Sequence, residues 1–156
     1  MQCWIDAQDY CNTSAKFIPK EVAVVTPSSV TKYVITYSNQ LRSFETFDRK
    51  LILWATKNYH RIPYYAGDTH ESALKAKIYQ STALCTEIYT KGSDKAVWLE
   101  GLLQKPVVDL HALGCPSLRK VELRPACSEH LSADSRCAVS GALFMREWFN
   151  GRSARP

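Results

Sequence analysis

The sequence contains no long apolar run, no leader-like start and no cluster of basic residues. No apolar run approaches the roughly 20 residues that a membrane-spanning helix needs. Met1 is followed by Gln2 and Trp4 rather than by a charged and then apolar leader. We therefore expect a protein that has no membrane partner, is not secreted, and works in the cytoplasm, the nucleus or both.

Basic residues outnumber acidic ones but are spread along the chain. The formal charge is +5 at pH 7, and the isoelectric point is near 8.9. This mild excess is compatible with attraction to phosphate groups, although no run of lysine and arginine marks a binding segment. A nucleic-acid-binding surface would therefore have to be assembled by folding.

The chain has six cysteines, which could in principle form three disulfides. In the reducing compartment expected here, thiols are more often buried spectators or metal ligands than disulfide partners. We predict that Cys3, Cys11 and Cys85 are spectators. Cys115, between a glycine and a proline, is expected to lie in a turn rather than to bind metal.

Length and composition predict one globular domain. The chain has 156 residues, of which 46% are hydrophobic and 22% charged. It contains no repeat, low-complexity segment or internal linker. We predict a single domain over residues 1–150 and a frayed, basic tail over residues 151–156.

Local patterns predict an alternation of strands and helices. Short runs rich in β-branched and aromatic residues predict strands at 2–8, 21–26, 30–37, 86–91 and 107–110. Helical spacing predicts helices at 46–59, from a cap at Asp68 to Leu84, at 93–103 and at 135–149. This order predicts an α/β fold with a five-stranded mixed sheet. An antiparallel meander is followed by parallel strands, and helices cover the faces.

Three of these helices carry more detailed predictions. The first has an apolar stripe, expected to face the core, made of Phe47, Leu51 and Trp54, with Leu53 beside them. Asp68 and Glu71 have the spacing of a capping box for the second helix, and Ser93 is the expected N-cap of the third.

The densest group of reactive side chains is Cys127, His130 and Cys137, in the pattern CxxHxxxxxxC. Zn²⁺ binds thiolate and imidazole ligands tetrahedrally, and a CxxH pair can direct two side chains at one point. The third ligand would arrive from the start of the last helix. The pattern predicts three ligands of a zinc site, whose fourth ligand must come from elsewhere.

The carboxylates are too sparse for an ordinary two-metal nuclease, which needs several of them converging on two cations. Asp6 lies on the first strand, but two positions later stands Gln8, a neutral amide. Asp94 and Asp134 are the later candidates. The topology and these positions resemble the RNase H-like fold of the DEDD 3′ to 5′ exonucleases. Gln8 stands where that family has a carboxylate, and Asp134 lies one residue early for its HxxxxD motif.

Three segments resemble the Maelstrom domain, a member of the same superfamily that has lost the exonuclease carboxylates. They are FIPKEVAVVT, HRIP at residues 60–63, and CSEH together with Cys137. The resemblance implies that Glu21 is the fourth ligand of a structural zinc ion, beside Cys127, His130 and Cys137. It also implies a role in transposon silencing by small (Piwi-interacting) RNA, with proteins of that pathway as partners.

The leading hypothesis is therefore a zinc-stabilised, catalytically degenerate nuclease-fold module that binds single-stranded RNA. Arg61, Tyr64, Tyr65 and Lys91 are the predicted RNA contacts, with the two tyrosines as exposed aromatics available for base stacking. Two alternatives stay open. One is an active single-strand nuclease using Asp6, Asp94 and Asp134. The other is a protein-interaction scaffold without nucleic-acid contact.

Overall fold

Six strands form one mixed sheet in the computed structural model, which describes residues 1–10, 17–118, 121 and 123–153. The sheet order is β4-β3-β2-β1-β5-β6. The strands are β1 (Gln2–Asp9), β2 (Pro19–Val25), β3 (Val30–Thr36), β4 (Thr69–His70), β5 (Glu87–Thr90) and β6 (Val107–Asp109). The pairs β1–β2 and β2–β3 are antiparallel, whereas β3–β4, β1–β5 and β5–β6 are parallel.

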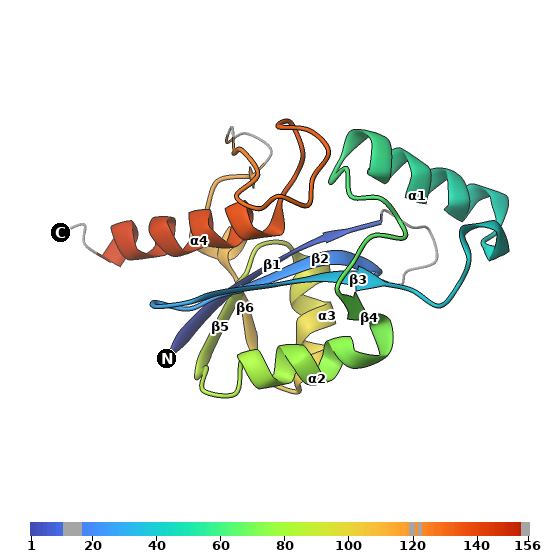
Figure 1. Cartoon of the computed structure of the whole chain (residues 1–156). Helices are drawn as coiled ribbons and strands as arrows, with labels where there is room; N and C mark the ends of the chain where they lie inside the picture. The colour runs from blue at the N-terminus through green and yellow to red at the C-terminus, as the bar shows by residue number, and fades with distance from the viewer. Residues whose placement is uncertain (11–16, 119–120, 122, 154–156) are drawn as a thin grey trace.

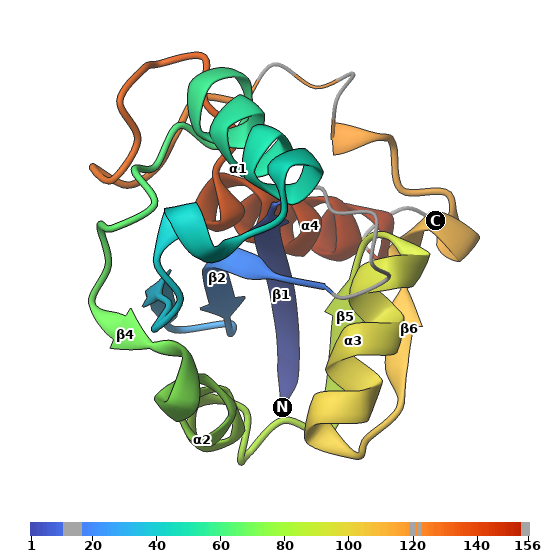
Figure 2. The same cartoon turned by 90° about the vertical axis from the view of Figure 1, so that its right-hand side faces the viewer.

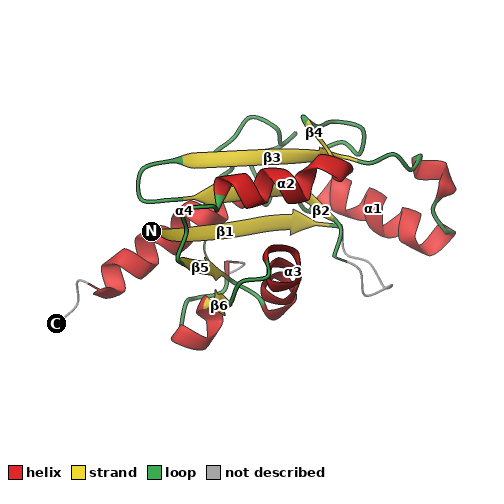
Figure 3. Cartoon of the chain, turned by 90° about the horizontal axis from the view of Figure 1, so that it is seen from below, coloured by secondary structure: helices red, strands yellow, loops and turns green. Residues whose placement is uncertain are grey.

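Within the described residues, four α-helices cover the two faces of the sheet. They are α1 (Thr46–Asn58), α2 (Glu71–Ser81), α3 (Ser93–Leu103) and α4 (Ala138–Ser153). Figure 1 shows α4 and α1 on one side of the sheet and α2 and α3 on the other, and Figure 3 shows the α2 and α3 side. None of these helices is long and apolar enough to cross a membrane. The predicted α/β fold with an antiparallel and then a parallel part is confirmed.

The alternation of side chains along β1 divides the core into two layers. Cys3, Ile5 and Ala7 are buried in the layer shared with α2 and α3, whereas Trp4 is buried against α4. All seven residues of β2 are buried, because this strand is covered on both faces. A polar side chain on β1 or β2 therefore lies in the interior and needs an internal partner.

Helix α1 lies over the end of the sheet where β1 finishes, and it packs through few side chains (Figures 1 and 2). Ile52 and Ala55 are its buried residues, in a small cluster with Tyr10 and Tyr64. The predicted core stripe is wrong: Phe47, Leu53 and Trp54 are 58%, 48% and 50% exposed. The helix buries its opposite face because it rests on this side cluster instead of the sheet.

The predicted five strands become six because β4 was missed, and its formation also changes the helix starts. Asp68 accepts a hydrogen bond from Val34 N on β3, and Glu71 accepts one from Ser38 N just after β3. Both carboxylates therefore bind the backbone of this edge segment instead of capping α2. The N-cap of α2 is His70, whose ring accepts from Ser72 N. Ser93 is the first residue of α3, not its N-cap, which is Gly92 with a φ of 116°.

The last helix is shifted relative to its predicted bounds. It begins at Ala138 rather than at Ser135 and continues to Ser153. Residues 151–153 are thus helical rather than a frayed tail, and 154–156 lie outside the described residues.

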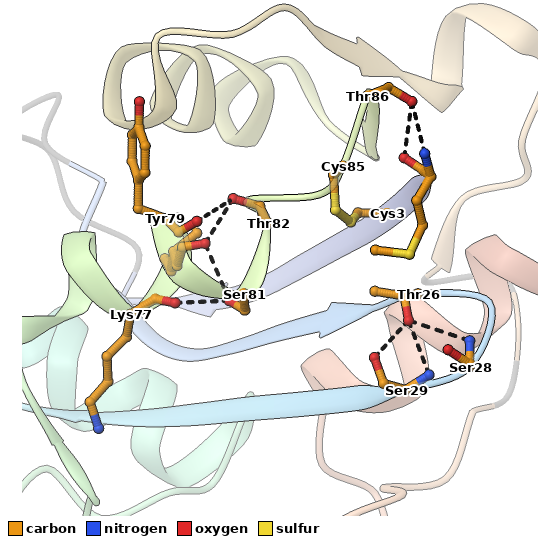
Figure 4. Close-up of a disulfide and its surroundings, with 12 residues drawn as sticks. Cys3, Thr26, Ser28, Ser29, Lys77, Tyr79, Ser81, Thr82, Cys85 and Thr86 are labelled. Carbon is orange, nitrogen blue, oxygen red and sulfur yellow. Dashed lines mark hydrogen bonds between the residues drawn. A yellow bond between two sulfur atoms is a disulfide. The ribbon is translucent and has the colours of Figure 1, made fainter.

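Cys3 and Cys85 form a disulfide, so the prediction that both are spectators is wrong (Figure 4). Cys3 lies on β1, and Cys85 lies between α2 and β5. The bond ties the first strand to the segment that begins the parallel half of the sheet. Cys115 is a buried free thiol, and Cys11 lies outside the described residues.

Candidate metal centre

Four side chains that are far apart in the sequence converge beside the start of α4. Glu21 comes from β2, Cys127 and His130 from the loop before α4, and Cys137 from the position directly before the helix. Figure 1 shows this loop folding over the start of α4. One ligand atom from each residue lies within 4.8 Å of all the others. The structure thus brings together the four ligands named from the sequence.

Three of the separations between ligand atoms can be compared with those around a tetrahedral metal ion such as zinc. Zinc bonds of about 2.0 Å to nitrogen or oxygen and about 2.3 Å to sulfur place tetrahedral ligand atoms roughly 3.3–3.8 Å apart. Glu21 Oε2 lies 3.1 Å from Cys127 Sγ and 3.2 Å from His130 Nε2. The two sulfur atoms, of Cys127 and Cys137, are 3.6 Å apart. These three separations are close to the ideal values, and all four ligand atoms lie within 4.8 Å of one another.

The Glu21 carboxylate divides its two oxygens between the cluster and α4. Oε2 faces Cys127 and His130, and Oε1 accepts a 2.6 Å hydrogen bond from the backbone N–H of Ala138, the first residue of α4. Glu21 is fully buried on β2, opposite Gln8 of β1 and Val34 of β3. The sheet therefore fixes this carboxylate in position, and one oxygen remains for a metal.

His130 is oriented as zinc-binding histidines commonly are. Its Nδ1 is hydrogen-bonded to the carbonyl oxygen of His60, which fixes the proton on Nδ1. Nε2 then points at Glu21 Oε2, 3.2 Å away, and it would offer its lone pair to a metal that displaces its proton. The His60 carbonyl belongs to the HRIP segment, so that segment sets the tautomer and the direction of a ligand.

The two thiols lie among backbone N–H groups that favour thiolates. Cys137 accepts hydrogen bonds from the backbone of Ser140 and Ala126, and Cys127 accepts one from Glu129. Because Cys137 precedes α4 directly, its sulfur also lies at the positive end of the helix dipole. An anion at this point satisfies helix donors that would otherwise lack partners.

In the metal-free protein the two thiols share a proton. The hydrogen bond from Cys127 lowers the pKa of Cys137, despite burial, while the same bond raises the pKa of Cys127. Burial opposes protonation of His130, but its hydrogen bonds to Cys137 and Glu21 outweigh burial and raise its pKa to about 10. The cluster thus has a ready thiolate, and a cation would replace protons held by Cys127 and His130.

No protein family model matches this sequence, and neither the curated proteins nor the solved structures include a significant match. The chemistry of the cluster therefore rests on its own geometry. The side chains of His130 and Glu21 are 1% and 0% exposed, and Cys137 is buried. Cys127 is half-buried. A cation bound by all four residues would have four protein ligands and no open position for substrate.

The carboxylates of the nuclease alternative do not converge. Asp6 is fully buried, with Oδ1 2.6 Å from Lys95 Nζ and Oδ2 accepting from Gln8 Nε2 at 3.3 Å. Burial raises the pKa of Asp6, against the effect of Lys95. Asp94 is exposed in the first turn of α3, and Asp134 is exposed and 3.7 Å from Arg61. Among the described residues these three aspartates form no metal-binding group.

The four predicted RNA contacts do not form one exposed surface. Tyr64 is only 5% exposed, so its expected exposure is wrong; its ring packs among other aromatic rings, and its OH donates to Asn39 O. Arg61 donates to Lys57 O and Ser132 Oγ and is therefore used within the fold. Lys91 is half-buried, and only Tyr65, at 68%, is widely exposed.

Lys20 has a structural role that the sequence analysis missed. Its side chain is fully buried, and its Nζ donates to three backbone carbonyls: Ile35 O at 2.8 Å, Tyr64 O at 2.8 Å and Ala66 O at 2.5 Å. Burial lowers the pKa of Lys20 to about 8, so the ammonium group with its three donors persists at pH 7. The signal in the sequence was a charged pair, Lys20–Glu21, opening an otherwise apolar strand.

Proposed function

We propose that this chain is a zinc-stabilised, RNase H-like module of the Maelstrom type that binds single-stranded RNA and has lost two-metal nuclease chemistry. One observation supports this most directly. The closed Glu21–Cys127–His130–Cys137 cluster has the ligand set and spacing of a structural zinc site. The strand order, with an antiparallel half and a parallel half joined at β1, supports the RNase H-like assignment.

The proposed zinc role is to join three separate parts of the chain. Glu21 belongs to the sheet, Cys127 and His130 to the long loop, and Cys137 to the start of α4. When bound, zinc would supply folding free energy by cross-linking these parts. Hydrogen bonds within the protein pre-arrange the site. Glu21 accepts one from Ala138 N, and the His60 carbonyl accepts one from His130 Nδ1.

The proposed loss of nuclease chemistry follows from the partner of Asp6. A metal-binding aspartate needs a free carboxylate beside further anionic ligands. Here an ammonium group, that of Lys95, is already 2.6 Å from Oδ1, and the neighbouring side chain is the amide of Gln8. The ion pair takes the place of the charge balance that a divalent cation would provide.

Elemental analysis of the purified protein tests the zinc part. We expect about one zinc ion per chain in the wild type. The double variant Cys127→Ser/His130→Ala should contain much less zinc and melt at a lower temperature. Cys115→Ala is the matched control, because this buried thiol lies outside the cluster. Zinc content that is absent in the wild type, or unchanged in the double variant, would refute the site.

Filter binding with labelled single-stranded RNA tests the nucleic-acid part. We expect retention at low ionic strength that falls as salt rises, because lysines and arginines would contact phosphates. Absence of retention at low salt contradicts RNA binding. Magnesium-dependent degradation of the strand that Asp6→Asn abolishes would instead establish the active nuclease.

A further inference from the structure

Helix α1 presents a stripe of alternating aromatic and basic residues to solvent. Phe47, Lys50, Trp54 and Lys57 are spaced i, i+3, i+7 and i+10, and therefore lie on one face of the helix. Phe47 is 58% exposed and Trp54 50% exposed, and both lysines are exposed. We call these four residues the α1 stripe.

The fold itself does not cover the α1 stripe. The helix is anchored through its other face, where Ile52 and Ala55 are buried with Tyr10 and Tyr64. The Trp54 ring stacks on Tyr59, with centroids 6.4 Å apart and an interplanar angle of 23°. One ring face is thus supported from within the protein, which holds the indole as a platform.

A shallow pocket lies beside the start of α1. It is lined by Gln40, Leu41, Arg42, Arg49 and Tyr65. The OH of Tyr65 accepts from Leu41 N at 3.3 Å, and its ring meets Tyr64 edge-on, with centroids 5.1 Å apart. Tyr65 is therefore a third exposed aromatic held in place, between two arginines.

Both charged residues of the α1 stripe, Lys50 and Lys57, are basic, and the acidic Glu45 and Asp48 of the helix start lie outside the stripe. Among the described residues, no ion pair involves Arg42, Arg49, Lys50 or Lys57. Asp48, the acidic residue of the first turn, belongs to the side of α1 that carries Ile52 and Ala55. The α1 stripe therefore presents two lysines to solvent, and no carboxylate within the stripe would repel an RNA phosphate.

We propose that the α1 stripe and the Tyr65 pocket are the surface on which a single strand of RNA docks, an inference that rests on the proposed RNA binding. Bases of a single strand stack on exposed aromatic rings, and lysines between the rings contact the phosphates. Phe47 and Trp54 are seven residues apart, roughly 10 Å along the helix, with Lys50 between them. A duplex keeps its bases stacked within the helix, so it gains nothing from the rings. A surface that binds through both stacking rings and cations therefore favours a single strand over a duplex.

Two pairs of substitutions separate stacking from charge. We expect Phe47→Ala/Trp54→Ala to weaken binding of a fluorescein-labelled oligouridine by about tenfold or more in fluorescence anisotropy, with an unchanged salt slope. Lys50→Gln/Lys57→Gln should weaken binding and reduce the slope of log affinity against log salt by roughly 1.4, about 0.7 for each lost phosphate contact. Lys75→Gln/Lys77→Gln on α2, at the other face of the sheet, is the charge-matched control and should leave affinity almost unchanged.

The outcomes distinguish this placement from the proposed function. A wild-type protein that binds no oligouridine at low salt overturns RNA binding itself. Wild-type binding that both stripe variants retain overturns the placement alone, as does equal binding of duplex RNA. If the aromatic variant changes the sedimentation coefficient of the protein but not its RNA affinity, the stripe is a protein contact and the placement is wrong. Unaltered circular dichroism and melting of the variants would show that these surface changes leave the fold intact.

Discussion

Gly141 of α4 lies against Asp6 of β1 so closely that a Cβ at Gly141 would be 2.0 Å from Asp6 Oδ2 and 2.9 Å from Cγ. The absence of a side chain at this point lets the helix rest directly on a buried carboxylate. Asp6 cannot swing away freely, because its other oxygen is bound to Lys95. The packing of α4 on the sheet thus depends on a glycine in the middle of a helix.

Gly141→Ala should destabilise the protein, although alanine favours helix over glycine. The methyl group must displace α4 or break the Asp6–Lys95 pair, and overpacking of this kind costs about 1–3 kcal/mol. The free energy of unfolding in urea measures the effect. Gly151→Ala, in the same helix with nothing within 4 Å, is the control and should be neutral or slightly stabilising. Equal effects of the two changes would refute the close contact.

Lys95→Met should cost about 3–5 kcal/mol of unfolding free energy, because it leaves the fully buried Asp6 carboxylate without its cation. Adding Asp6→Asn removes the stranded charge and should restore much of the loss. A double-mutant cycle by urea unfolding measures the coupling. Additive effects of the two single changes would show that the pair contributes nothing.

The Cys3–Cys85 disulfide closes a span of 82 residues. A cross-link of this length stabilises by about 4.5 kcal/mol in the loop-entropy model. We expect a phosphine reductant to lower the melting temperature of the wild type. Cys3→Ala/Cys85→Ala should melt at a similarly low temperature and be insensitive to the reductant. A wild-type melting temperature that the reductant leaves unchanged would contradict a structural role for the bond.

His60 should make the protein sensitive to acid. Burial lowers the pKa of His60 to about 3 from its ordinary 6.5, and its Nδ1 accepts from Ile62 N. Below pH 6.5, His60 becomes protonated in the unfolded chain but stays neutral in the folded protein. Stability is therefore lost as the pH falls from 6.5 towards 3. At pH 5 the loss amounts to about 2 kcal/mol, at 1.36 kcal/mol per pH unit.

His60→Asn provides the comparison, because the asparagine oxygen can accept from Ile62 N in place of Nδ1 while carrying no titrating group. Urea unfolding at pH 7 and pH 5 should show a smaller pH dependence in the variant. Identical pH dependence in both proteins would assign the acid sensitivity to other groups.

The sequence predicted the mixed sheet and the four members of the metal cluster, because both leave local marks. Strands such as β2 are continuous apolar runs, and Cys127, His130 and Cys137 have ligand spacing. Glu21 was named only through a family resemblance, since its partners lie more than 100 residues away. Its convergence with the other three is a property of the fold.

The errors of prediction come from contacts that no local pattern records. The two-residue β4 exists only through backbone pairing with Ile35 and Thr36. The spacing of Phe47 and Trp54 correctly indicates a helical face, but periodicity does not tell which face is buried when a helix rests on a small cluster rather than on the sheet. Composition favoured free thiols, and only the three-dimensional proximity of Cys3 and Cys85 shows their bond.

Adjacent residues Lys20 and Glu21 bury opposite charges on opposite faces of β2, and this arrangement protects the strand against misalignment. A slip of one residue exchanges the two faces of a strand. It would bring an ammonium group to the thiols and the imidazole, and a carboxylate to three carbonyl oxygens, which repel it. In a strand of otherwise interchangeable valines and alanine, the two charges therefore specify a single alignment during folding.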